Sequence, residues 1–261
     1  MRVRNWIAVL ALITAGMTPP SLADDCEFRA DRNAGVDAGG VVKIVIHAGA
    51  GDLKVHGTDA RRIDARGEAC AGKQTLLDQA QVSVRREGNV VYVETQLPQD
   101  NDGWNWGKNE YAYIDLAVTL PVNIAVEATD SSGDASFEDL KSLSLQDSSG
   151  DLTLARIAGA VDVNDSSGDL DIHDVKADVV VENDSSGDIR ITKVDGSVLI
   201  EQDSSGSIRV EDVRGSVTVN NDSSGDIYAG RVKGDFTVKN DSSGSIGHTA
   251  IGGKISVPRE D

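Results

Sequence analysis

The stretch of residues 203–221 reads DSSGSIRVEDVRGSVTVNN and carries the strongest structural signal in the chain. Apolar and polar residues alternate in two short runs, Ile208–Val210 and Val217–Val219, and a glycine lies two residues before each run. Alternation with a period of two is typical of a β-strand that buries one face. The stretch therefore predicts two short strands joined by tight turns.

The tetrapeptide Asp-Ser-Ser-Gly that opens this stretch occurs seven times, at intervals of 17, 18, 19, 19, 19 and 19 residues. Such a period is too short for a propeller blade or a two-helix repeat, and it suits one coil of a β-solenoid. Stacked coils bury a continuous core that one coil cannot form alone. We therefore predict an all-β, parallel β-helix-like solenoid. Its inward side chains are expected to include Val198, Ile200, Ile208, Val210 and Val217.

Residues 129–261 carry the repeat, whereas residues 24–128 are rich in expected strands but lack its period. We expect this N-terminal part to cap the rod, because a free solenoid end exposes strand edges that invite pairing. At the other end, Pro258 and the charges after it are expected to blunt the last strand. The expected N-terminal elements are a helix at Gln74–Ala80 and strands at Val41–His47, Asp52–His56, Ile63–Ala69, Gln81–Arg86, Val90–Thr95, Tyr111–Leu120 and Val122–Ala128.

Each tetrapeptide is expected to form a turn in which Asp and Ser accept backbone N–H bonds and Gly takes a positive φ. The first Asp of each turn stacks on like-charged neighbours, so repulsion would raise its pKa and turn hydrogen bonds would lower it. We expect the hydrogen bonds to prevail, with pKa values below those of the unfolded chain. The seven aspartates are Asp130, Asp147, Asp165, Asp184, Asp203, Asp222 and Asp241.

The residue before each of these aspartates is polar and is expected to point inward. Stacked amides would then form a hydrogen-bonded ladder, and a solvated loop amide is the alternative. The seven residues are Thr129, Gln146, Asn164, Asn183, Gln202, Asn221 and Asn240.

A second acidic column follows the turn glycines. Calcium ions between the coils would relieve the repulsion within the two acidic columns, so a Ca²⁺-stabilised repeat module is one alternative reading. In the simpler reading, turn amides satisfy the first column and water solvates the second, and no cofactor is needed. The second column consists of Asp134, Asp151, Asp169, Asp188 and Asp226.

The first 23 residues have the features of a secretory signal peptide. Arg2 and Arg4 precede the apolar run Trp6–Ala15, which is too short to span a bilayer, and Ser21-Leu-Ala23 offers a cleavage site. We therefore expect a protein exported to the periplasm or the cell surface, without membrane insertion. In an oxidising compartment, the two cysteines Cys26 and Cys70 are expected to form a disulfide.

The formal net charge is −18, from 43 acidic and 25 basic residues. Such a surface repels phosphate groups, which excludes a basic-patch reader of nucleic acid. No serine is distinguished by a neighbouring histidine or a Gly-x-Ser-x-Gly elbow, so a catalytic serine is not expected. A carbohydrate-active enzyme remains an alternative, because such enzymes place carboxylates in a groove along the same fold.

Two further motifs point to a family. His47–Gly57 reads HAGAGDLKVHG and Asp115–Pro121 reads DLAVTLP, and Gly-Asp/Ser-apolar repeats follow them. Together they resemble the bacterial putative-adhesin family of unknown function, which includes the auto-transporter-adhesin-head-like domains. The resemblance covers Val41 to Val257. It implies an envelope-associated β-solenoid without established catalytic residues.

Aromatic residues gather in one glycine-rich segment, Gly103–Tyr113. They would either close the end of the rod or contact a sugar or partner protein. These residues are Trp104, Trp106, Tyr111 and Tyr113. We expect a non-catalytic, adhesin-like interaction scaffold of the bacterial envelope, with an envelope protein or polysaccharide as its partner.

Overall fold

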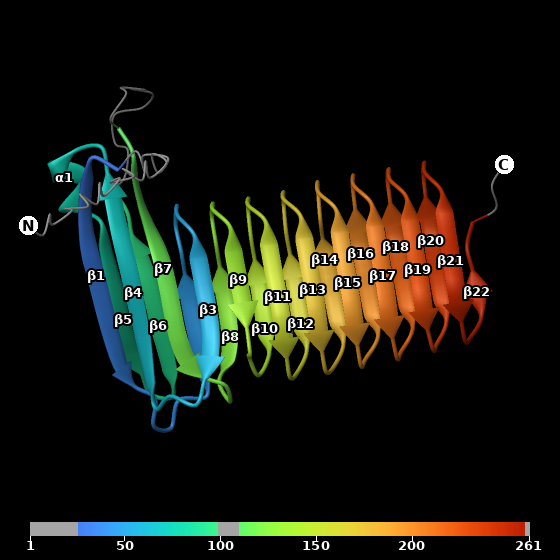
Figure 1. The fold of residues 1–261 in the computed structure, drawn as a ribbon, viewed down its shortest axis with the longest axis horizontal. Coiled ribbons are helices and arrows are strands. Elements are labelled where there is room, and N and C mark those ends of the chain that lie inside the picture. The colour runs from blue at the N-terminus through green and yellow to red at the C-terminus, as the bar shows by residue number, and fades with distance from the viewer. Residues whose placement is uncertain (1–25, 99–109, 259–261) are drawn as a thin grey trace, which may run out of the picture.

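The computed structural model describes residues 26–98 and 110–258, which form a rod (Figure 1). These residues contain β1 (Phe28–Asp37), β2 (Lys43–His47), β3 (Leu53–Thr58), β4 (Arg62–Ala71), α1 (Gln74–Leu77), β5 (Gln81–Glu87), β6 (Val90–Gln96), β7 (Ala112–Pro121), β8 (Ala125–Thr129), β9 (Ala135–Glu138), β10 (Leu143–Gln146), β11 (Leu152–Ile157), β12 (Val161–Asn164), β13 (Leu170–Val175), β14 (Val179–Asn183), β15 (Ile189–Val194), β16 (Val198–Asp203), β17 (Ile208–Val213), β18 (Val217–Asp222), β19 (Ile227–Val232), β20 (Phe236–Asp241), β21 (Ile246–Ile251) and β22 (Ile255–Ser256).

Two 11-stranded sheets face each other along the rod. Sheet A has the order β1-β4-β7-β3-β9-β11-β13-β15-β17-β19-β21, and sheet B has the order β22-β20-β18-β16-β14-β12-β10-β8-β2-β6-β5. Every repeat contributes one strand to each sheet, and the strands of successive repeats pair in parallel. The predicted β-solenoid is therefore confirmed.

The core lies between the two sheets and consists of like residues in register. Ile189, Ile208 and Ile227 pair directly along sheet A. The five side chains predicted to point inward all have exposed fractions of 1% or less. Burial of a branched aliphatic side chain contributes about 1.5–3 kcal/mol, so this stack is the main source of the rod's stability.

The N-terminal part joins the same two sheets. β2 pairs in parallel with β8 in sheet B, and β3 pairs in parallel with β9 in sheet A. Beyond them, β4 pairs antiparallel with β7 and with β1, and β5 pairs antiparallel with β6. The expected N-terminal strands are present and the helix is shorter than expected, whereas β1 was not predicted. The change at residue 129 is therefore a change of sequence period within one continuous core.

The tetrapeptide turns require glycine for two reasons. Gly206 has a φ of +128°, and a Cβ on it would lie 1.7 Å from the carbonyl oxygen of Gly187 in the preceding coil. The same geometry recurs in all seven tetrapeptides. The predicted positive φ is thus confirmed, and close stacking of the turns adds a steric requirement.

The structure also contains the predicted disulfide. Cys26 and Cys70 are bonded, with a Cα–Cα distance of 5.6 Å. Cys70 lies in β4, so the bond ties the start of the described chain to the antiparallel end of the rod. Within the described ranges, no helix is long and apolar enough to cross a membrane.

Candidate functional site

The aspartates that open the repeats point into the core. Six of them have exposed fractions of 4% or less, and the last, Asp241, is half-buried. We name the seven the inner aspartate column: Asp130, Asp147, Asp165, Asp184, Asp203, Asp222 and Asp241.

The prediction of an inward amide ladder is therefore wrong. In the 19-residue coils, two residues separate the last inward aliphatic from the aspartate, as Glu201 and Gln202 do between Ile200 and Asp203. Neither of the two is buried. The extra residue shifts the alternation by one position, so that the aspartate side chain, and not the preceding amide, points into the core. The amides bond along the surface instead. Asn240 Nδ2 donates to Asn221 Oδ1 at 2.9 Å, for example.

The inner column is short of hydrogen-bond donors. Ser131 N–H donates to Asp130 Oδ1 at 2.9 Å, and Ser167 N–H donates to Asp165 Oδ1 at 3.2 Å. The second oxygen of each of these carboxylates is buried and has no partner among the described residues. The turn thus satisfies one oxygen of these two carboxylates. In Asp147, Asp184, Asp203 and Asp222, both oxygens are buried without a hydrogen bond in the described part of the chain.

Burial raises the pKa of most inner aspartates, and repulsion from the neighbouring aspartates adds to the effect. The pKa of Asp147, of Asp184 and of Asp203 rises to about 7. The pKa of Asp130 and of Asp222 rises to about 6. Serine N–H groups oppose these shifts but are outweighed, because loss of solvation penalises the charged form more strongly. The expectation that turn hydrogen bonds prevail is therefore wrong.

The second acidic column lies on the outside, and each carboxylate bonds the coil that follows it. Asp188 Oδ1 accepts the N–H of Ser207 at 2.8 Å, and Asp169 Oδ1 accepts the N–H of Asp188 at 3.0 Å. A hydrogen bond from a backbone N–H stabilises a carboxylate, and these side chains are also exposed to water. We name this set the outer aspartate column: Asp134, Asp151, Asp169, Asp188 and Asp226.

A third column consists of one residue in each coil, none of them glycine, whose backbone is in the left-handed region. Its φ angles lie between +53° and +59°, and its charges alternate in sign from coil to coil. Arg156 binds both carboxylate oxygens of Asp139 at 2.8 Å, and this guanidinium lowers the pKa of Asp139. The column was not predicted, although its alternating charges can be read when the repeats are aligned. Its members are Asp139, Arg156, Asp174, Lys193, Asp212, Arg231 and Ala250.

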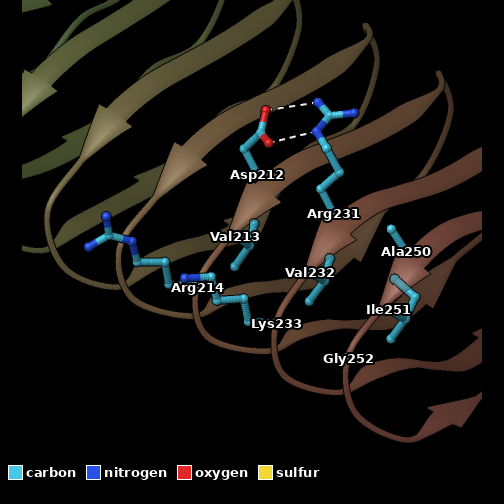
Figure 2. A pocket seen from close by; sticks show the side chains of 9 residues that line it. All are labelled: Asp212, Val213, Arg214, Arg231, Val232, Lys233, Ala250, Ile251 and Gly252. Atoms are coloured by element: carbon cyan, nitrogen blue, oxygen red, sulfur yellow. Dashed lines mark hydrogen bonds and ion pairs between the residues drawn. The ribbon is translucent and has the colours of Figure 1, made fainter.

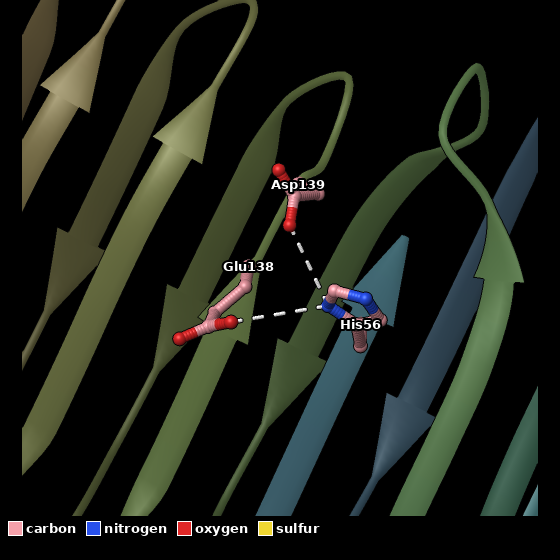
Figure 3. Close-up of side chains that lie close together, drawn as sticks. All are labelled: His56, Glu138 and Asp139. Carbon is pink, nitrogen blue, oxygen red and sulfur yellow. Dashed lines mark ion pairs between the residues drawn. The ribbon is translucent and has the colours of Figure 1, made fainter. Parts of the chain in front are cut away.

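One group of side chains has the composition of a metal site. His56 Nδ1 lies 3.6 Å from an oxygen of Asp139 and 3.9 Å from an oxygen of Glu138 (Figure 3). It is the one such group of three found within the described residues. Arg156 already binds both carboxylates, at 2.7 Å in the case of Glu138. One guanidinium thus already binds oxygens of both carboxylates, and we assign no metal to them.

A surface hollow of about 650 Å³ lies over the second turn of the last coils (Figure 2). Val213, Val232 and Ile251 are among its apolar lining residues, and the lining also includes the cations Arg214 and Lys233. The lining acid, Asp212, is bound by Arg231 at 2.6 and 2.8 Å. A general acid–base pair needs groups free to exchange a proton, and this ion pair does not provide one.

The serines of the tetrapeptides are engaged with the backbone. The second serine of a turn donates its hydroxyl to the carbonyl of a serine one coil earlier, as Ser224 does to Ser204 at 3.2 Å. The same bond recurs in several coils. The second serine of these five turns therefore links one coil to the preceding one.

The aromatic segment is only partly described. Trp104 and Trp106 lie outside the described residues. Tyr111 and Tyr113 stack with ring centroids 6.5 Å apart, and the Tyr111 hydroxyl accepts the N–H of Glu27 at 3.3 Å. These two tyrosines thus lie at the antiparallel end of the rod, and Tyr111 is bonded to a residue near the start of the described range.

A family model described as Toastrack DUF4097 matches residues 41–252. A "putative adhesin" from Bacteroides fragilis is 13% identical with a TM-score of 0.47, and the match covers 89% of this chain and 98% of that one. A "putative lipid binding protein" from Parabacteroides distasonis is 14% identical with a TM-score of 0.49 over 88% and 97%. A "putative cell adhesion protein" from Clostridium sporogenes is 12% identical with a TM-score of 0.33 over 89% and 100%. A search of curated proteins found no match.

Proposed function

Because this chain belongs to the Toastrack DUF4097 family, whose description names no activity, we propose its function from its surface: an exported, non-catalytic interaction scaffold of the bacterial envelope. The rod repeats the Asp-Ser-Ser-Gly turn in seven successive coils, and this repeating surface is suited to an extended partner. The partner is an envelope protein or polysaccharide.

One observation carries the proposal. Outer aspartates, turn serines and the arginines of the third column bond a neighbouring coil, so polar groups on the surface of the described repeats form columns linked from coil to coil. Catalysis needs one constellation that differs from its surroundings, with a nucleophile or a proton donor held apart for substrate. Repeated groups that bond one another favour a scaffold over an enzyme.

The charge of the coils indicates where the partner binds. Ser166–Asp184 contains six acidic residues and one lysine, the most acidic of the repeats. An acidic stripe attracts cationic groups and speeds encounter with them. We therefore place the contact on the central coils, with basic protein segments or amine-bearing glycans as the complementary chemistry.

Sedimentation with isolated envelope fragments tests this proposal. One triple Asp→Asn variant removes charges from the central coil, and a control removes as many exposed aspartates from the N-terminal part. The variants are Asp169, Asp171 and Asp178 to Asn, and Asp31, Asp37 and Asp59 to Asn.

We expect the first triple variant to lose at least tenfold in binding and the control to stay near the original protein. Equal losses would show that net charge alone acts, and absence of binding by the original protein would refute the scaffold. Release of soluble sugars from the fragments would instead establish the carbohydrate-active enzyme.

A further inference from the structure

The two ends of the rod protect their strand edges differently. At the N-terminal end, the edge strands carry charges: Arg29, Asp31 and Arg32 in β1, and Arg85 and Arg86 in β5. Charges on an edge strand discourage pairing with another chain. At the C-terminal end, β21 reads IGHTAI and contains neither proline nor a lysine, arginine or acidic residue.

Pro258 and the charges after it were predicted to protect the C-terminal end from pairing, but they do not protect β21. Pro258 follows β22, which has only two residues and lies in the other sheet. Proline guards the strand that contains it, because it removes a donor from that strand only. Sheet A therefore ends in an unguarded six-residue strand.

The backbone of β21 has unused hydrogen-bonding groups. Ile227 N–H donates to Ser245 O at 2.9 Å, so the polar groups of residue 245 face β19. Backbone groups alternate in direction along a strand, and those of Ile246 and His248 therefore face away from β19. Within residues 26–98 and 110–258, sheet A has no further strand on that side. This edge offers a partner a ready row of donors and acceptors.

Apolar side chains accompany this open edge. Ile255 and Val257 are 40% and 36% exposed, and Ile246 and Ile251 are only partly buried. The imidazole of His248 lies edge-on to Phe236, with ring centroids 6.2 Å apart. Ala250 takes the left-handed position that a charged residue takes in the six preceding coils. The last coil is thus the apolar counterpart of the coils before it.

The charge of this end selects its partner. Residues 242–261 contain two basic and two acidic residues and so have no formal net charge, in a chain of net charge −18. A second copy of the chain is repelled by the acidic coils, and the repulsion is smallest when the two C-terminal ends meet. A strongly basic partner would be drawn to the acidic coils instead. The open edge therefore suits another copy of the same end.

We propose that two copies of this chain associate through their C-terminal coils, edge to edge. A twofold axis perpendicular to the rod reverses the partner's strands, so β21 pairs antiparallel with the partner's β21, and β22 with its counterpart. The apolar side chains of both last coils then become buried. The result is a rod of double length with both charged N-terminal ends outward.

Analytical ultracentrifugation of the full protein over a concentration series tests the proposal. Thr249 lies on the outer face of β21, and Thr192 occupies the same register position in the central strand β15. We expect Thr249→Lys to raise the dimer dissociation constant at least tenfold, because each copy then carries a lysine near the middle of the shared edge strand. Thr192→Lys adds the same charge within the rod and is expected to leave the dissociation constant unchanged.

A cysteine pair gives a positive signal. Thr249→Cys is expected to form a covalent dimer under mild oxidation, and Thr192→Cys is expected not to. The native cysteines are already bonded to each other. A protein that stays monomeric up to about millimolar concentration would overturn the proposal. So would open-ended polymers, or a dimer that neither Thr249 variant affects.

Discussion

The inner and outer aspartate columns contain the same residue four positions apart, and the structure gives them opposite environments. Asp184 has no exposed surface, and Asp188 is exposed and bonded to the next coil. Burial raises the pKa of Asp184 to about 7. The carboxylate of Asp188 is solvated by water and accepts a backbone N–H, so its negative charge costs little free energy. The contrast shows that the direction of the side chain decides what a repeated aspartate does.

The largest expected effect on stability comes from placing a charge on the inward face of a strand rather than on its outward face. Val217 is 1% exposed in β18, and its neighbour Thr218 points to the other face. Val217→Asp is expected to destabilise the protein by about 3–5 kcal/mol, because the new carboxylate is buried without a partner. Thr218→Asp, the matched control, is expected to cost less than about 1 kcal/mol. Denaturant unfolding of both variants measures the difference, and equal midpoints would contradict the assignment of the two faces.

The second prediction concerns pH. An inner aspartate binds its proton more tightly in the folded state than in the unfolded state, whose pKa is near 3.9. The folded state therefore holds more protons between about pH 4 and pH 7, and stability falls as the pH rises through the folded values. We expect the melting temperature to rise by several degrees between pH 8 and pH 5. A fall over that range would show that the turn hydrogen bonds control the column.

Much of the fold was predictable because it repeats. The period of 19 and the alternating aliphatics suffice to place the two strands of each coil, as Ile208 and Val217 illustrate. β1 was missed because its sequence, FRADRNAGVD, contains few aliphatic residues. Its side chains alternate between half-buried and exposed, and none of them is fully buried. Its partner is β4, and pairing across distant segments leaves no local signal.

The environment of the columns was less predictable. Counting by twos from Ile200 places Gln202 inward, but the 19-residue coils insert one residue before the aspartate and reverse that assignment. The shorter coils give the signal that was needed. Asp165 follows the inward Val163 by two residues, without an extra one. Comparing coils of different length therefore identifies the inward residue better than counting within one coil.

The third prediction compares the two columns directly. Asp184→Asn keeps an oxygen for the turn and removes a buried charge, so it is expected to stabilise the protein by about 1 kcal/mol at pH 8. The gain should vanish near pH 5, where Asp184 is protonated. Asp188→Asn in the outer column is expected to change little at either pH. Thermal melts of both variants at the two pH values provide the measurement, and destabilisation by Asp184→Asn at pH 8 would refute the description of the inner column.

The smallest effect tests the bonds of the outer column. Asp188→Ala removes the acceptor that Ser207 N–H uses at 2.8 Å, whereas Asp188→Asn keeps an oxygen for it. Water can replace the lost acceptor at this exposed position, so the expected loss is only about 0.5 kcal/mol. The asparagine variant is the control and is expected to match the original protein, because the hydrogen bond rather than the charge matters here. Amide hydrogen exchange at Ser207 distinguishes the cases, since it should speed up in the alanine variant alone. Faster exchange in both variants would mean that the negative charge, and not the acceptor, holds the outer edge of the coils together.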